Sequence, residues 1–242
     1  MDVPLSLTEL YALLLESYGK QGWWPVLSRS NEPGFDSRGY HPGIIKVSLD
    51  DSDRWEIAVG AILTQNTAWT NVEKALYGLS EGSLETPRAV LAASAETVAL
   101  AIRPSGYYNQ KALRLKSFAQ FYQSLKGRVP TRAELLSLSG IGPETADSML
   151  LYAWQRPFFV IDTYTIRILK RLGYTNDCFF QKQPSKRYED VQLYITSKLN
   201  SPQKHMQYQE FHALLVRHAK EHCGAKARCE TCPLEARCRK ML

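Results

Sequence analysis

The segment Leu138-Ser139-Gly140-Ile141-Gly142-Pro143-Glu144-Thr145-Ala146 predicts a turn between two helices. Gly140 and Gly142 permit backbone angles that would strain other residues, and Pro143 suits the first turn of a helix. The N–H groups at the start of that helix have no intrahelical partner and can bind a phosphate oxygen. By itself the stretch fits both a tight helix-helix corner and a phosphate-binding hairpin.

The pattern of apolar residues on both sides of this turn is helical. Apolar residues recur every three or four positions, whereas the alternation typical of strands is short and sparse. Capping boxes mark two helix starts, Ser6 with Glu9 and Thr131 with Glu134. The sequence therefore predicts an all-α fold of roughly ten helices. The expected helices are 6–18, 55–63, 70–79, 87–93, 95–102, 109–125, 132–138, 143–154, 162–172, 188–199 and 206–218, and residues 27–53 are expected to be irregular.

The composition is that of a globular protein. Of the 242 residues, 44% are hydrophobic, and 30 Lys and Arg against 24 Asp and Glu give a net charge of +6. This length allows one or two domains of roughly 150 residues each. No apolar run approaches the ~20 residues that span a bilayer, and the first residues lack the features of a signal peptide. We expect a cytoplasmic location in a bacterial or archaeal cell, near the nucleoid, without membrane contact.

Four of the five cysteines lie close together: Cys223, Cys229, Cys232 and Cys238. In a reducing compartment such clustering favours a metal or an iron-sulfur cluster over disulfides. A single Cys-x2-Cys pair suits adjacent irons of a cubane, whereas zinc usually takes two such pairs. The spacing leaves both groups open. Cys178 is interpreted as an ordinary thiol, and the histidines show no spacing typical of metal ligands.

The order of these motifs resembles the helix-hairpin-helix superfamily of DNA repair glycosylases, to which endonuclease III belongs. The resemblance covers roughly residues 6–238. Two segments, Gly22-Trp23-Trp24-Pro25 and Arg103-Pro104-Ser105-Gly106, make the match more specific. With them, the sequence looks most like the 3-methyladenine DNA glycosylases of the endonuclease III-like branch. The segments that carry it are the hairpin, residues 61–67, 106–112 and 159–164, and the four terminal cysteines.

The resemblance implies a two-domain fold. A six-helix barrel is expected over residues 29–156, and a discontinuous iron-sulfur cluster domain over 1–28 and 157–242. The resemblance favours a [4Fe-4S] cluster over zinc, although the five residues between Cys223 and Cys229 are one fewer than is typical of endonuclease III. It implies double-stranded DNA with damaged bases as the partner, bound by a monomer.

Asp162 is the catalytic candidate that the resemblance indicates. Cleavage of an N-glycosidic bond develops positive charge on the sugar, which a carboxylate stabilises while it orients or deprotonates water. Asp162 could also be a helix N-cap, and the two roles are compatible. In bifunctional members, a lysine early in the helix after the hairpin attacks the sugar. Here that position holds Glu144, which cannot form an imine, so we expect hydrolysis without lyase activity.

Aromatic residues are expected to bind the damaged base. Extrusion of a base costs a few kcal/mol, and stacking of roughly 1 to 3 kcal/mol offsets it. The resemblance places Trp23, Pro25 and Trp69 at the base-sandwiching positions, and the alternative is that the tryptophans belong to the core. It places Gln65 and Tyr107 at the two wedge positions that fill the vacated space. For Gln65 the alternative is a helix C-cap or surface amide, and Tyr107 replaces the aliphatic residue usual in endonuclease III.

The remaining site residues are expected to hold the DNA backbone. Gly140, Gly142 and Thr145 present the hairpin to a phosphate, and Lys226 and Arg228 form a basic clamp beside the cysteines, although a run of charges is often only a solvated face. The leading hypothesis is a monofunctional glycosylase for alkylated purines, especially 3-methyladenine. The alternatives are a glycosylase for oxidised pyrimidines or mismatched thymine, and a noncatalytic DNA-binding or redox module.

Overall fold

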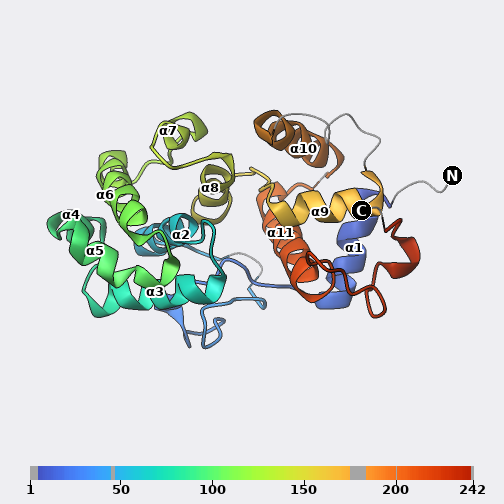
Figure 1. Cartoon of the computed structure of the whole chain (residues 1–242), viewed down its shortest axis with the longest axis horizontal. Coiled ribbons are helices and arrows are strands. Elements are labelled where there is room, and N and C mark those ends of the chain that lie inside the picture. The colour runs from blue at the N-terminus through green and yellow to red at the C-terminus, as the bar shows by residue number, and fades with distance from the viewer. Residues whose placement is uncertain (1–4, 45–46, 175–183, 200, 241–242) are drawn as a thin grey trace. The chain divides into compact units, whose positions relative to one another are not determined.

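The computed structural model describes residues 5–44, 47–174, 184–199 and 201–240. Within these ranges the fold is helical, as predicted, and has no strand beyond an isolated bridge between Cys223 and Ala227. The chain divides into two compact units, residues 1–23 with 157–242 and residues 24–156 (Figure 1). The first boundary lies between Trp23 and Trp24 rather than after residue 28. No helix in the described ranges is long and apolar enough to cross a membrane.

The unit of residues 24–156 is built around two helices. The short helices α4 and α5 both pack on α6, and α2 packs against α3, α6 and the π-helical segment η3. This unit contains α2 (Asp51–Leu63), α3 (Trp69–Glu81), α4 (Pro87–Ala92), α5 (Ala95–Ala101), α6 (Tyr108–Leu125), α7 (Arg132–Leu136) and α8 (Pro143–Ser148), with η1 (Leu27–Arg29), η2 (Arg103–Ser105) and η3 (Met149–Ala153).

Helix α2 forms the centre of this unit. It begins at Asp51 rather than at the predicted Trp55, because Asp50 and Asp53 form a capping box that apolar periodicity does not reveal. From residue 57 to residue 63 every position is buried. Trp55 stacks on Phe118 of α6, with ring centroids 5.7 Å apart. This stacking packs the N-terminal half of α2 against α6.

The unit of residues 1–23 and 157–242 holds α1 (Leu7–Tyr18), α9 (Thr163–Leu172), α10 (Pro184–Lys198), α11 (Lys204–Glu221) and η6 (Glu235–Arg237). The predicted capping box of Ser6 and Glu9 starts α1, which packs on α11, and α11 also packs on α9 (Figure 1). Phe211 of α11 contacts the rings of Tyr11 and Phe159. The packing of α9 on α11 brings two segments of the chain together around Asp162.

Candidate functional site

The predicted hairpin is present between α7 and α8. Arg132 of α7 donates two hydrogen bonds, of 2.7 and 3.2 Å, to the fully buried carboxylate of Asp147 on α8, which ties the two helices together. Gly140 has φ +80°, and a Cβ there would lie 2.2 Å from Nε of Arg114. Gly142 is the N-cap of α8, with open space where its Cβ would be. The positive φ at position 140 favours glycine, and a Cβ there would also press against the Arg114 side chain of α6.

The side chain of Gln65 is anchored to this hairpin. Its Nε2 donates to the carbonyl of Gly140 and to the hydroxyl of Thr145, both at 2.9 Å. Its Oε1 accepts a hydrogen bond of 2.6 Å from Nη1 of Arg114. Four residues from three segments of the unit thus form one network. The structure brings together three predicted residues, Gln65, Gly140 and Thr145, around a fourth that the sequence did not indicate.

The side chain of Tyr107 lies on the protein surface. It is 66% exposed and occupies the N-cap position of α6 with φ +46°, a left-handed conformation that is costly for an aromatic residue. The buried Lys111 holds the backbone around it, because Nζ donates to the carbonyls of Leu63 at 2.7 Å and of Ser105 at 2.8 Å. One ammonium therefore joins the end of α2, just before Gln65, to the turn that carries Tyr107.

Two of the three predicted base-binding residues lie in the unit of residues 24–156. Pro25 and Trp69 are buried, and Trp69 meets Trp24 edge to face, with ring centroids 5.2 Å apart. Trp24 also contacts the ring of Tyr152. The partly exposed Trp23 belongs to the other unit. The sequence analysis did not select Trp24, which contacts Trp69.

Asp162 is the N-cap of α9, as predicted. Its Oδ1 accepts a hydrogen bond of 2.7 Å from the backbone N–H of Thr165, and its Oδ2 lies 3.6 Å from Nε2 of His212 on α11. The residue is 8% exposed. Its two oxygens are therefore held separately, one by the start of a helix and the other by an imidazole.

These contacts determine the charge of the Asp162 carboxyl. Burial raises its pKa, because desolvation disfavours the charged form. The His212 imidazole, when protonated, and the N–H and hydroxyl of Thr165 outweigh that effect, so the net pKa lies below the usual value of 3.8. Asp162 is consequently an ionised, nearly buried carboxylate at neutral pH. Glu144, by contrast, is exposed in the first turn of α8.

The four clustered cysteines line one cavity of about 240 Å³. Burial, and to a lesser extent the neighbouring cysteines, raises the pKa of the Cys232 thiol. His222 lines the same cavity, and its buried Nδ1 has no hydrogen-bond partner among the described residues. A space enclosed by four thiols and one orphaned imidazole nitrogen fits an iron-sulfur cluster, whose iron atoms bind thiolates and whose sulfides accept hydrogen bonds.

Contacts with α9 hold the segment that begins at Cys223. Within the described residues, no group of three His, Cys, Asp or Glu side chains is arranged to hold a single metal ion. Arg171 of α9 donates to Sγ of Cys223 at 3.3 Å and to the carbonyl of Gly224 at 2.7 Å. Cys178 lies outside the described residues. The loop is therefore anchored on α9 through Arg171.

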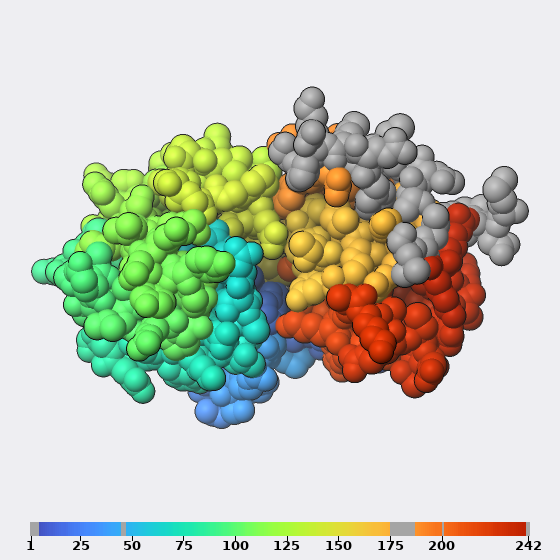
Figure 2. Space-filling view, in the orientation of Figure 1, coloured from blue at the N-terminus to red at the C-terminus, as the bar shows by residue number. Residues whose placement is uncertain are grey.

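The predicted basic clamp belongs to the C-terminal segment, part of whose surface Figure 2 shows in red. Lys226 and Arg228 are both exposed, in the loop between Cys223 and Cys229. Arg228 donates to the carbonyl of Lys220 at 2.8 Å. The loop that presents these cations is thus the one that supplies the first two thiols of the cavity.

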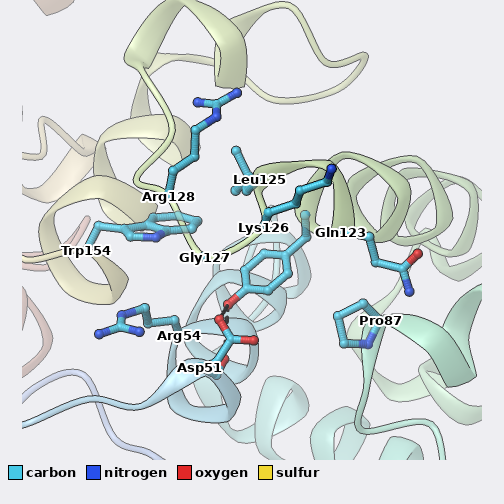
Figure 3. Close-up of a pocket in the computed structure, with 10 residues that line it drawn as sticks. Asp51, Arg54, Pro87, Gln123, Leu125, Lys126, Gly127, Arg128 and Trp154 are labelled. Atoms are coloured by element: carbon cyan, nitrogen blue, oxygen red, sulfur yellow. Dashed lines mark hydrogen bonds between the residues drawn. The ribbon is translucent and has the colours of Figure 1, made fainter.

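Another cavity, of about 140 Å³, contains none of the predicted residues. It lies between the N-terminal end of α2 and the C-terminal end of α6 (Figure 3). Arg54, Lys126, Arg128 and Trp154 line it, and Tyr122 donates to Oδ1 of Asp51 at 2.9 Å.

The sequence analysis missed three residues that hold the predicted ones. Lys111 and Arg114 lie three positions apart on α6 and thus share one face. The sequence signal that could have indicated Lys111 was a lysine among the buried positions of a helix. His212 lies in the apolar run 211–215 of α11, and nothing near it in sequence points to Asp162. A polar residue within an apolar face was the shared indication.

This chain is similar in sequence and in structure to DNA repair glycosylases. Residues 59–194 match the HhH-GPD superfamily of base excision DNA repair proteins. A protein of Methanocaldococcus jannaschii, provisionally named a DNA repair glycosylase, is 36% identical over 95% of this chain and 94% of its own. Endonuclease III of Sulfolobus acidocaldarius is 28% identical over 75% of this chain and 79% of its own.

A solved structure extends the likeness to the fold. The crystal structure of the Helicobacter pylori 3-methyladenine DNA glycosylase bound to 1,N6-ethenoadenine superposes with a TM-score of 0.66 at 26% identity and covers 90% of this chain and 98% of its own. The matched residues 59–194 include the hairpin, Gln65 and Asp162. This chain therefore belongs to the HhH-GPD superfamily of base excision DNA repair proteins.

Proposed function

We propose that this protein is a monofunctional DNA glycosylase that hydrolyses the N-glycosidic bond of alkylated purines, 3-methyladenine foremost, after the nucleotide has been flipped out of duplex DNA. The observation that carries the proposal is Asp162, an ionised carboxylate held at the start of α9 by Thr165 and His212. Such a group suits a reaction in which positive charge develops on a sugar.

In the proposed reaction, Asp162 stabilises the sugar and directs a water molecule. As the bond between C1′ and the base nitrogen breaks, its electron pair leaves with the base, and the carboxylate stabilises the resulting positive charge on the sugar. The water oxygen attacks C1′ and gives its proton to Asp162. The products are a free base and an intact abasic strand, and no other co-reactant is needed.

Alkylated purines are the proposed substrates because they suit a site that supplies one carboxylate. A cationic base departs as a neutral molecule, so it needs no protonating acid. Its charge also favours the face of an indole ring, a cation–π contact of about 0.5 to 2 kcal/mol. We propose Trp23, Pro25 and Trp69 as the base-binding residues. The H. pylori relative is named a 3-methyladenine DNA glycosylase, which supports this choice.

We propose hydrolysis without strand cleavage. A glycosylase that also cleaves the strand needs an amine to form a Schiff base with the sugar. The first turn of α8 carries Glu144 at the position where bifunctional members have lysine, and glutamate cannot form this bond. In this respect we expect the protein to differ from endonuclease III.

Duplex DNA is the proposed partner, bound by a monomer. Gly140, Gly142 and Thr145 would contact one strand backbone, and Lys226 and Arg228 another phosphate. Gln65 and the exposed Tyr107 would occupy the space that the flipped nucleotide leaves. This activity requires the compartment that contains the DNA, and we propose a cytoplasmic location near the nucleoid of a bacterial or archaeal cell.

A [4Fe-4S] cluster is the proposed cofactor. Cys223, Cys229, Cys232 and Cys238 would hold it, and it would cross-link their loops as a structural group. Within this arrangement the chain's own residues position the clamp, because Lys226 lies between the first two cysteines. In this proposal the unit of residues 1–23 and 157–242 is the cluster unit, and the unit of residues 24–156 is the barrel unit.

The test is a panel of duplexes that each carry one lesion. We expect release of 3-methyladenine and other alkylated purines, no covalent trapping by borohydride, and loss of release in Asp162→Asn, which keeps the N-cap but not the charge. Asp50→Asn, the same change at the N-cap of α2, is the matched control and should remain active. Release of oxidised pyrimidines or mismatched thymine alone would favour the alternative substrate class. Unchanged turnover in Asp162→Asn would refute the mechanism.

A further inference from the structure

Arg114 of α6 is the one member of the Gln65 network that no motif indicated. Its guanidinium donates from Nη1 to Oε1 of Gln65 at 2.6 Å. Its stem lies against the hairpin, since a Cβ on Gly140 would be 2.6 Å from Cδ and 2.2 Å from Nε. Arg114 therefore contacts the proposed wedge and the hairpin at the same time.

This contact determines which way the Gln65 amide faces. Arg114 has only donors, so it fixes the amide oxygen toward α6. The amide nitrogen then faces the hairpin, and its two N–H groups are directed to Gly140 and Thr145. Without the guanidinium, nothing else in the described network holds Oε1, and the amide could rotate. An ordered side chain loses less conformational entropy when it enters DNA than a freely rotating one does.

We propose that Arg114 is a positioning residue that orders Gln65, and through it the selectivity of the protein for DNA in which one base is displaced. This inference rests on the proposed function, because it takes Gln65 as the residue that fills the vacated space. Arg114 acts through Gln65 and not by contact with a phosphate. Its effect should therefore disappear when Gln65 is removed.

Binding of a stable probe tests this proposal without any chemistry. The probe is a labelled duplex that carries a tetrahydrofuran abasic analogue opposite thymine, and selectivity is the Kd of the undamaged duplex divided by the Kd of this probe. The variant Arg114→Met keeps the stem that packs on Gly140 and removes the donors. We expect it to lower selectivity about tenfold, the ordinary worth of a charge-assisted hydrogen bond. Arg88→Ala, which removes an exposed arginine of α4, should leave selectivity unchanged.

A double-mutant cycle separates positioning from a merely structural or electrostatic role. Gln65→Ala should lower selectivity at least as much as Arg114→Met, and the double variant should lose less than a further twofold. The salt dependence of binding should not change in Arg114→Met, whereas a lost phosphate contact would lower its slope by about one. Thermal melts by circular dichroism report whether each variant is folded.

The possible failures are distinguishable. If the unaltered protein binds both duplexes equally, the wedge role in the proposed function is wrong. If it is selective but Arg114→Met remains equally selective, or loses selectivity equally with and without Gln65, the positioning role of Arg114 is wrong and the proposed function stands.

Discussion

Lys111 should make the stability of the barrel unit depend on pH in an unusual direction. The residue is 1% exposed and donates to two backbone carbonyls, and it has no carboxylate partner among the described residues. Burial, with repulsion from Arg114 as a smaller cause, lowers the pKa of its ammonium from 10.5 to about 8. The folded protein therefore binds this proton less tightly than the unfolded chain does. Between pH 8 and 10.5, stability should rise with pH, since the unfolded state holds more protons there.

The magnitude follows from these two pKa values. At 1.36 kcal/mol per pKa unit, the difference between 10.5 and about 8 corresponds to about 3 kcal/mol over the whole window, of which about 2 kcal/mol falls between pH 7 and 9.5. The variant Lys111→Met removes this titration. It also leaves the carbonyls of Leu63 and Ser105 without their donor, which costs about 1 to 3 kcal/mol each. The two effects oppose each other at pH 7, so the pH dependence is the quantity that isolates the ammonium.

The assay compares free energies of unfolding in urea at pH 7 and 9.5 for the unaltered protein and Lys111→Met. Tryptophan fluorescence reports mainly the barrel unit, which contains all the tryptophans except Trp23. The stability of the unaltered protein relative to the variant should increase by about 2 kcal/mol at the higher pH. Lys74→Met, which removes an exposed lysine of α3, is the matched control. A difference that stays constant to within about 0.5 kcal/mol, the scatter allowed by additivity, would show that the buried ammonium is not destabilised in this way.

Three further predictions concern the hairpin, the cysteine cavity and the clamp. Gly140→Ala should destabilise the protein by about 1 to 3 kcal/mol, because it combines a positive φ with a clash against Arg114, and a thermal melt unchanged within error would contradict this account. Cys229→Ser should abolish visible absorbance near roughly 400 nm and lower the iron content from about four per chain; full iron retention would exclude Cys229 as a ligand. Joint replacement of Lys226 and Arg228 by alanine should weaken binding to all duplexes alike and lower the salt slope by about two, whereas a change confined to one sequence would indicate base contacts.

Local features of the fold could be predicted from the sequence. The capping boxes of α1 and α7, the N-cap of α9 at Asp162 and the glycine turn of the hairpin depend on residues at most a few positions apart, so their signals are complete within a short window. Helix ends were less certain. Helix α2 starts earlier than apolar periodicity implied, because a polar capping box extends a helix without adding to its apolar face.

In the candidate site, too, local features could be predicted from the sequence, whereas contacts between distant residues could not. The sequence alone showed which residue types are available: one aspartate after a hairpin, four clustered cysteines, and several aromatic residues. Three contacts are visible only in the folded chain: His212 lies beside Asp162, fifty positions away, Trp24 meets Trp69, and Arg114 reaches Gln65. The physical reason is that such pairs form when separate helices pack, and packing depends on the shape of whole faces rather than on any local pattern.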